Sequence, residues 1–203
     1  MSRATGDPEQ VLHFWFGQLD ADGFADEEHE ARWWRKDPAF DQLIQDRFGG
    51  LHEAVLAGRR DDWLAAARSR LAVILVLDQF SRNMFRGSGR MHTGDARARD
   101  AAADGIERGM DRALAHHERS FFYMPLMHSE TLADQDRCVE LVTRWRDEAS
   151  GHWRERVVKF LPYAEQHRDI VRRFGRFPHR NEILGRASTP EELAFLTRPG
   201  SSF

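Results

Sequence analysis

Three short motifs place charged and imidazole side chains among apolar residues, where ligand binding and acid–base chemistry need them. The first motif, Leu77–Gly87, carries Asp78, Arg82 and Arg86. At about 100° per residue, Asp78 and Arg82 continue the apolar stripe of the helix expected before them. Charges on such a stripe are unfavourable unless they are paired or face a ligand. The motif therefore predicts either a buried ion pair at a helix end or one wall of a binding pocket.

The second motif, Phe121–Glu130, is apolar up to Pro125 and polar after it. Pro125 favours a kink that places His128 and Glu130 at the polar end. Residues two apart on a helix point to nearly opposite sides, so a regular helix would not let this pair chelate one ion. Two interpretations stay open: a buried histidine beside a capping glutamate, or an acid–base pair.

The third motif, His167–Asn181, interleaves arginines with aromatic residues. Gly175 is typical of a helix stop, and Asn181 is typical of the cap of a following helix. A helix start beside guanidinium groups suits an anion. The alternative is a loop that arginines attach to helix C-terminal carbonyls. The candidate ligand-binding residues of the three motifs are Asp78, Arg82, Arg86, His128, Glu130, His167, Asp169, Arg173, Arg176, His179, Arg180 and Asn181.

The elements that must position these residues are helical. Asp7-Pro8 and Asp37-Pro38 are helix-start signals, and Thr189 with Glu192 fits a capping box. Strands are not indicated, because no segment alternates with period two beside turn signals. We expect an all-α single domain, residues 1–203, with roughly eight helices. The long helical segments are Asp61–Met84, Asp95–Arg112, Ala133–Glu148 and Trp153–Phe174, and glycines 58, 87, 94, 151 and 175 are expected to stop helices.

Composition narrows the function class. The chain has 203 residues, of which 41% are hydrophobic, and this is enough for one sizeable core. The formal charge of −3 argues against a general attraction to nucleic acid. All but two of the 30 basic residues are arginines, the exceptions being Lys36 and Lys159. Arginine suits bidentate contacts with carboxylate or phosphate, although a GC-rich genome gives the same bias.

Other classes lack sequence support. The N-terminus has no apolar signal region, and the longest aliphatic run, Leu71–Leu77, is far too short to cross a bilayer. Cys138 is alone, so neither disulfides nor a cysteine metal site is expected. The glycine-rich dinucleotide and phosphate motifs, HExxH and the EF-hand loop are absent, so we expect no cofactor and no metal. A soluble protein of the reducing cytoplasm, without membrane contact, is the simplest expectation.

Several segments together resemble a bacterial family called domain of unknown function 924. They are Trp15-Phe16-Gly17, Trp34 with Lys36–Asp41, LDQF-S-RNMFRG, FFYMPLMHSE and HRDIVRRFGRFPHRNEILGR-x-STPEE, in the order of the family from about Val11 to Leu196. The resemblance implies an all-helical fold similar to tetratricopeptide repeats, an array of antiparallel helix pairs. Ser81 stands where the family usually has proline, and Met124 where leucine is common. The resemblance brings no established activity.

Two function classes lead. The first is a binding module whose Arg-, His- and Asp-lined cleft holds a small anionic ligand or peptide segment. The second is a hydrolase or lyase that pairs a histidine (128, 167 or 179) with Glu130, Asp78 or Asp169, with arginines stabilising negative charge. Metal-assisted chemistry would need a site assembled from separate helices, and the motifs could also serve only to stabilise the fold, with the function elsewhere on its surface. The ligand and any catalysis are not specified by the residues. The density of Trp and Phe near the N-terminus leaves room for a homodimer.

Overall fold

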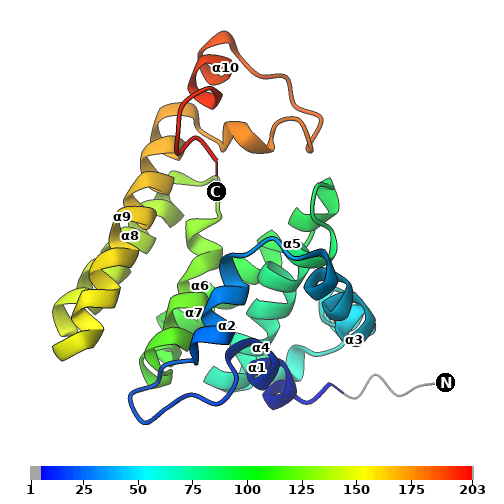
Figure 1. Ribbon diagram of the computed structural model, residues 1–203, viewed down its shortest axis with the longest axis vertical. Helices are drawn as coiled ribbons and strands as arrows, with labels where there is room; N and C mark the ends of the chain where they lie inside the picture. Colours follow the sequence, from blue (N-terminus) through cyan, green and yellow to red (C-terminus); the bar gives the residue numbers. More distant parts are fainter. Residues whose placement is uncertain (1–5, 203) are drawn as a thin grey trace. The chain divides into compact units, whose positions relative to one another are not determined.

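The computed structural model describes residues 6–202, and these form helices without any β-strand. The all-α prediction is confirmed for this part of the chain (Figure 1). The α-helices are α1 (Pro8–Phe16), α2 (Glu27–Trp34), α3 (Pro38–Leu56), α4 (Ala67–Leu75), α5 (Ser81–Met84), α6 (Asp95–Glu107), α7 (His116–Met127), α8 (Leu132–Glu148), α9 (Gly151–Phe174) and α10 (Pro190–Leu196). Short 3₁₀ or π segments are η1 (Asp61–Ala65), η2 (Val76–Phe80), η3 (Gly89–His92), η4 (Met110–Ala113) and η5 (Pro178–Arg180).

The predicted helix starts are confirmed by their caps. Asp7 accepts a hydrogen bond from the Glu9 amide at 3.1 Å at the start of α1. Asp37 caps α3 in the same way, through the amides two and three residues further on. Thr189 and Glu192 form the capping box of α10. These side chains satisfy amides that the first helical turn leaves without partners.

The described helices pack into two compact units. Unit 1 comprises residues 6–86 and 90–125, and unit 2 comprises residues 87–89 and 126–202. The boundary falls inside α7, between Pro125 and Leu126. The sequence predicts one domain over residues 1–203. One domain requires the two units to unfold together, and this stays a prediction.

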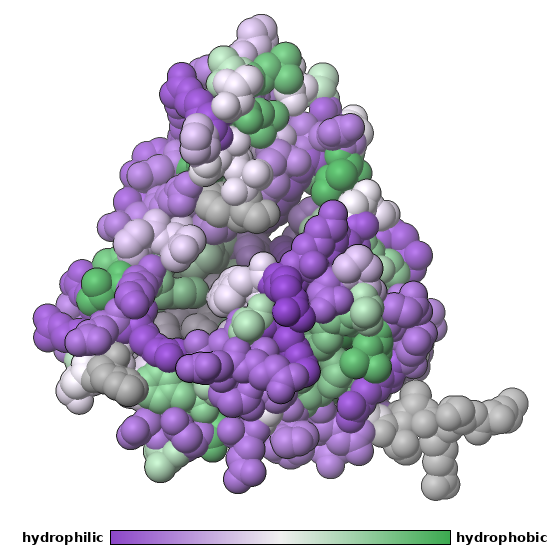
Figure 2. Space-filling view, in the orientation of Figure 1, coloured by the Kyte–Doolittle hydropathy of each residue, from purple (hydrophilic) through white to green (hydrophobic). Residues whose placement is uncertain are grey.

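Unit 1 is built around α4 and the start of η2, where the run Leu71–Leu77 is at most 2% exposed. This confirms the buried helix expected from the sequence. Trp15 is also buried, and its ring lies 5.6 Å from that of Phe121 in a perpendicular arrangement. Trp34 differs, since it is 68% exposed. On the face shown in Figure 2, hydrophilic residues cover most of the surface and apolar residues form separate small patches.

The segment predicted as one helix, Asp61–Met84, is divided into η1, α4, η2 and α5. The segment η2 is a π-helical turn, Val76–Phe80, which widens the helix between two α-helical parts. The sequence prediction of a regular helix through Asp78 is therefore wrong in detail. Single π turns inside α-helices occur frequently at functional sites.

Two of the predicted helix stops are wrong. Gly175 has a positive φ of 68° and ends α9, as expected for a left-handed C-cap. Gly94 instead precedes α6, and Gly151 is the first residue of α9. A side chain at Gly94 would lie 2.5 Å from the Leu77 carbonyl oxygen, so close backbone approach explains this glycine. The predicted helix from Asp95 also ends earlier, at Glu107.

Unit 2 contains a helical hairpin, because only two residues separate α8 from α9 and the two helices lie side by side (Figure 1). A small core of Ile170, Val171 and Phe177, with Phe174 and Phe195 against it, lies at the C-terminal end of α9. One antiparallel pair agrees with a tetratricopeptide-like array, but the array itself stays a prediction. No helix among residues 6–202 has the length and apolar character needed to cross a membrane.

Candidate functional site

The first motif forms a buried ion-pair network in unit 1. Asp78 is 1% exposed, and its Oδ1 lies 2.9 Å from Nη1 of Arg82. The same Nη1 donates to Oδ1 of Asp95 at 2.9 Å. Burial lowers the pKa of Arg82, but the two carboxylates outweigh it, and the net shift is upward. The pairing of Asp78 with Arg82 predicted from their spacing is confirmed, and Asp95 joins it.

Arg86 lies at the end of the same motif and binds another carboxylate. Its Nε and Nη2 donate to the two oxygens of Asp41 at 2.7 and 3.0 Å. Asn83 donates to the same Asp41 at 2.7 Å. Asp41 therefore ties α3 to the segment after the π turn. The guanidinium of Arg86 is engaged within unit 1.

In unit 2, Glu130 connects the end of the second motif to the third. Its two oxygens accept from Arg186 Nη1 at 2.6 Å and Nη2 at 2.9 Å, and Oε1 also accepts from the Phe177 amide at 2.8 Å. Burial alone would raise the pKa of Glu130, but these hydrogen bonds dominate and hold it below its usual value. The carboxylate that the sequence suggested for acid–base work is thus an ionised structural acceptor.

A second carboxylate holds Arg176 and Asn181. Arg176 donates to both oxygens of Glu192 at 2.6 and 2.8 Å, and Asn181 donates to Ser188 at 3.0 Å and to Glu192 at 3.3 Å. The hydrogen bonds from Arg176, the Thr189 amide and Asn181 lower the pKa of Glu192 to about 2. The sequence prediction that Asn181 caps a following helix is wrong, because Asn181 follows η5 and turns continue to Gly185.

Two further candidates lie on the surface of unit 2. Asp169 is contacted by Arg172 at 3.2 Å, and both side chains are at least half exposed. Arg173 donates to Glu191 at 2.7 Å, and its guanidinium lies 4.8 Å from the Phe174 ring centroid. These are solvent-exposed pairs, which contribute little to stability.

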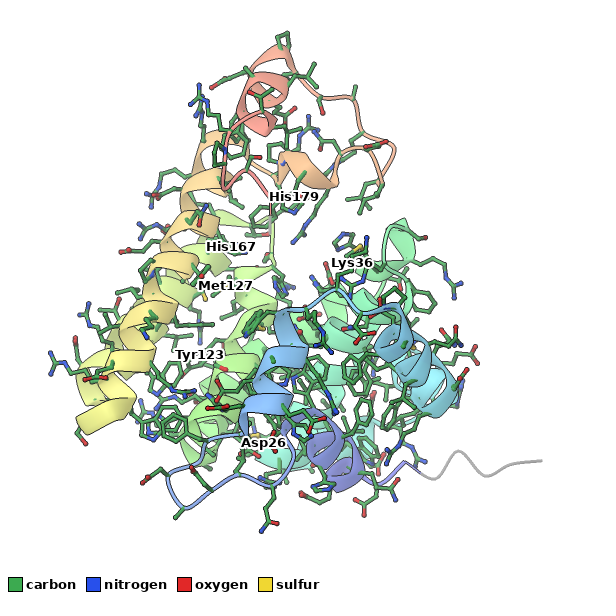
Figure 3. All side chains as sticks on the ribbon, viewed as in Figure 1. Asp26, Lys36, Tyr123, Met127, His167 and His179 are labelled. Atoms are coloured by element: carbon green, nitrogen blue, oxygen red, sulfur yellow. The ribbon has the colours of Figure 1, made fainter. Side chains whose placement is uncertain are left out.

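The remaining candidates are His128, His167, His179 and Arg180. His167, His179 and Arg180 lie at the buried ring of Phe177, and His128 lies beside His167. We call these four residues the imidazole cluster. The ring centroids of His167 and His179 each lie 5.6 Å from that of Phe177, and Arg180 Cζ lies 4.4 Å from it. His128 lies 6.3 Å from His167, ring to ring. Figure 3 shows His167 on α9 and His179 near η5.

His167 is the most deeply buried imidazole of the cluster, at 6% exposure. Its Nδ1 lies 2.7 Å from the Tyr163 carbonyl oxygen, one helical turn earlier on α9. Since a carbonyl only accepts, Nδ1 carries the proton in this contact. Burial first, and then electrostatic repulsion from His128, Arg180 and His179, lowers the pKa of His167 to about 3, although the carbonyl acts in the opposite direction.

Arg180 is only 7% exposed and bridges two segments of unit 2. Its Nη1 donates to the His128 carbonyl oxygen at 2.9 Å, just after the end of α7. This confirms the alternative in which arginine attaches the loop to a carbonyl at a helix end. It also fixes the guanidinium over the Phe177 ring, a favourable cation–π geometry.

Comparison with known proteins identifies the family of the chain. The model of the family described as "Bacterial protein of unknown function (DUF924)" matches residues 11–200. The chain belongs to this family. The solved structure of ATU0120, a protein of unknown function from Agrobacterium tumefaciens, is similar to this chain. The sequence identity is 42%, the TM-score is 0.76, and the match covers 93% of this chain and 96% of that one. No curated protein matches the chain.

In this DUF924 protein the twelve predicted site residues fall into separate sets. Asp78, Arg82 and Arg86 belong to unit 1, and the other nine belong to unit 2. Within unit 2 the structure brings four of the nine together as the imidazole cluster. Within residues 6–202, no group of three His, Cys, Asp or Glu side chains has the arrangement needed to hold a metal ion.

The sequence patterns did not reveal the residues that pair with the predicted site residues. Asp41, Asp95, Arg186 and Glu192 bind the predicted site residues but were not among them. Glu192 had a signal, because its capping-box position requires a buried carboxylate near the helix start. Asp41 and Asp95 had none, since their partners lie 45 and 13 residues away in the chain.

Proposed function

We propose that this DUF924 protein is a binding module and that the imidazole cluster of unit 2 binds a small anionic ligand or an anionic peptide group. The observation that supports this most is the grouping of His167, His179 and Arg180 around the ring of Phe177, with His128 beside His167. Imidazole and guanidinium groups donate hydrogen bonds to anions. The guanidinium is permanently charged, and a nearby anion favours the protonated imidazole. The ring of Phe177 offers apolar contact beside them.

The other arginines of the motifs already have carboxylate partners, and this supports the imidazole cluster as the anion site. Arg82, Arg86, Arg173 and Arg176 each bind a carboxylate of their own unit. An anion at any of them would compete with an existing ion pair. The imidazole cluster brings three imidazoles and one guanidinium together, and an added anion interacts favourably with such a group.

An enzyme of the hydrolase or lyase type is the second candidate, in the form that pairs His128, His167 or His179 with Glu130, Asp78 or Asp169. Glu130 and Asp169 bind arginines, and His167 Nδ1 binds a carbonyl. These contacts favour binding over acid–base catalysis at the cluster. If the motifs only stabilise the fold, the protein should show neither anion binding nor acid–base catalysis at the cluster.

Thermal unfolding with an anion panel tests the binding proposal. Inorganic phosphate, pyrophosphate, succinate and an acetylated peptide with a free carboxylate are each added to the protein. We expect at least one anion to raise Tm by several degrees, because a ligand that binds only the native state stabilises it. His179→Ala and Arg180→Lys should reduce that shift strongly.

The matched control is Arg172→Ala, which removes an exposed arginine of the same unit that pairs with Asp136 and Asp169. This variant should keep the full anion-induced shift. An unchanged Tm with every anion would contradict the proposal. An equal loss of the shift in Arg172→Ala and His179→Ala would indicate non-specific charge effects instead.

A further inference from the structure

His92 in unit 1 lies outside the imidazole cluster and has a different arrangement. It ends η3, and its Nδ1 lies 3.0 Å from Oδ2 of Asp95, the first residue of α6. Arg82 donates to the same carboxylate, with Nη1 2.9 Å from Oδ1 and Nη2 3.3 Å from Oδ2. Asp95 therefore lies between an imidazole and a guanidinium.

The far side of this network is fixed by the π turn. Arg82 Nη1 donates to the Asp78 carbonyl and lies 2.9 Å from Asp78 Oδ1, and Oδ2 of Asp78 accepts from Gln79 at 2.6 Å. The loop that carries His92 is held close to the same turn, because Gly94 approaches the Leu77 carbonyl. The positions of Asp95 and His92 are thus set by several independent contacts.

The contact with Asp95 decides which nitrogen of His92 carries the proton. A carboxylate bound to a guanidinium only accepts hydrogen bonds, so Nδ1 of His92 must donate. In the neutral ring, Nε2 then carries the lone pair. Nε2 is buried, and it has no hydrogen-bond partner among the described residues.

A purely structural ion pair would not need this second nitrogen. A buried acceptor without a partner destabilises the fold, and such groups in native proteins are often explained by function. The side chain of His92 is 11% exposed while Nε2 itself is covered, so a substrate reaches Nε2 only when the neighbouring side chains shift. A histidine with one nitrogen fixed by a carboxylate and the other unoccupied is the arrangement of a general base.

We propose that His92 is the proton acceptor of an acid–base site in unit 1, with Asp95, Arg82 and Asp78 as positioning residues. Its substrate class is a small organic molecule with an activated C–H or O–H bond. The proton moves from the substrate to Nε2, and the electron pair of the broken bond stays on the substrate. Asp95 stabilises the resulting imidazolium, which later returns the proton to the product or to water.

Elimination of 5-nitrobenzisoxazole probes such a base without knowledge of the natural substrate. The base takes the C–H proton, the N–O bond breaks, and the electrons form a nitrile and a coloured phenolate. His92→Asn is the informative variant, because the asparagine amide can still donate to Asp95 but lacks Nε2. We expect this variant to lose at least about tenfold of the protein-catalysed rate.

The chain offers a matched control in His29, whose Nδ1 contacts Asp26 at 2.8 Å with the same three-residue spacing. This second pair is more exposed, since Asp26 is 53% exposed. His29→Asn should keep the wild-type rate. Equal rates for the wild type and His92→Asn, at equal circular dichroism, would overturn the proposal.

Two nitrogen-15 NMR measurements test the proposal even if the His92→Asn variant does not fold. In the wild type, addition of 5-nitrobenzotriazole, an N–H donor of similar shape to the probe, should shift the Nε2 resonance of His92. In Asp95→Asn, the proton of neutral His92 should move toward Nε2, because the asparagine amide can donate to Nδ1. An Nε2 chemical shift that stays unchanged when the benzotriazole is added would also overturn the proposal.

Discussion

At the scale of single residues, the guanidinium groups of the three motifs are held by carboxylates from other elements. Glu192 shows the pattern best, because it is 2% exposed and accepts from Arg176, Asn181 and the Thr189 amide. Such a carboxylate stays ionised well below the usual pKa of glutamate. Its contribution to stability must therefore depend on pH.

Glu192→Gln is predicted to lower the free energy of unfolding at pH 7 by about 2 kcal/mol, since hydrogen bonds to a charged group are lost. The folded-state pKa of about 2 lies below the unfolded value of 4.5. The stabilisation is therefore complete above pH 4.5 and disappears as pH falls toward 2. Urea denaturation of both proteins at pH 7 and pH 2.5 measures this, and an equal difference at both pH values would contradict it.

His167 acts in a higher pH range. Its folded-state pKa of about 3 lies below the unfolded value of 6.5, so only the unfolded chain gains a proton between these values. Stability should fall by about 2 kcal/mol as pH drops from 6.5 to 4.5. His167→Gln should remove most of this slope in urea titrations. A slope that survives the substitution would show that other groups cause it.

At the scale of elements, the sequence patterns located most helices but not the π turn. Proline and cap signals marked α1, α3 and α10, because caps act within a few residues of the chain. The π turn at Val76–Phe80 has no such local signal. Gly94 was misassigned for a similar reason, since the Leu77 carbonyl that requires it comes from another element.

The candidate site was predictable only in part. The third motif contained His167, His179 and Arg180, and their grouping around Phe177 follows from a short loop after α9. The ion pairs of Arg86 with Asp41 and of Arg82 with Asp95 depend on packing between elements, which a single sequence does not reveal. Positions with local causes were therefore predicted, and those with tertiary causes were not.

Two glycines give a paired prediction for the helix ends. Gly175 ends α9 at φ 68°, with open space around an added Cβ, so Gly175→Ala should cost about 1 kcal/mol through backbone strain alone. Gly50 lies within α3 with equally open space, so Gly50→Ala should stabilise by about 0.5–1 kcal/mol. Chemical denaturation measures both. Effects of the same sign would contradict the assignment of the α9 C-cap.

At the scale of the whole molecule, the chain is all-α over its described residues and belongs to a family of bacterial proteins of unknown function. The 42% identity to the Agrobacterium tumefaciens protein, over 93% of this chain, makes the two proteins comparable along almost their whole length. Binding and catalysis are therefore questions that the same variants can address in both.

Calorimetry tests the prediction of one domain. The boundary between the two units lies inside α7, so one continuous helix belongs to both. We predict a single transition in differential scanning calorimetry, with equal calorimetric and van't Hoff enthalpies. Two resolved transitions would show that the units are separate domains.

The most direct test of anion binding at the imidazole cluster is an NMR titration of His167 with and without inorganic phosphate. Without phosphate, the pKa of His167 should be about 3. With saturating phosphate, it should rise by at least about one unit, because a nearby anion favours the charged imidazole. Arg180→Lys should weaken this effect. An identical titration curve with and without phosphate and the other anions of the panel would contradict the account.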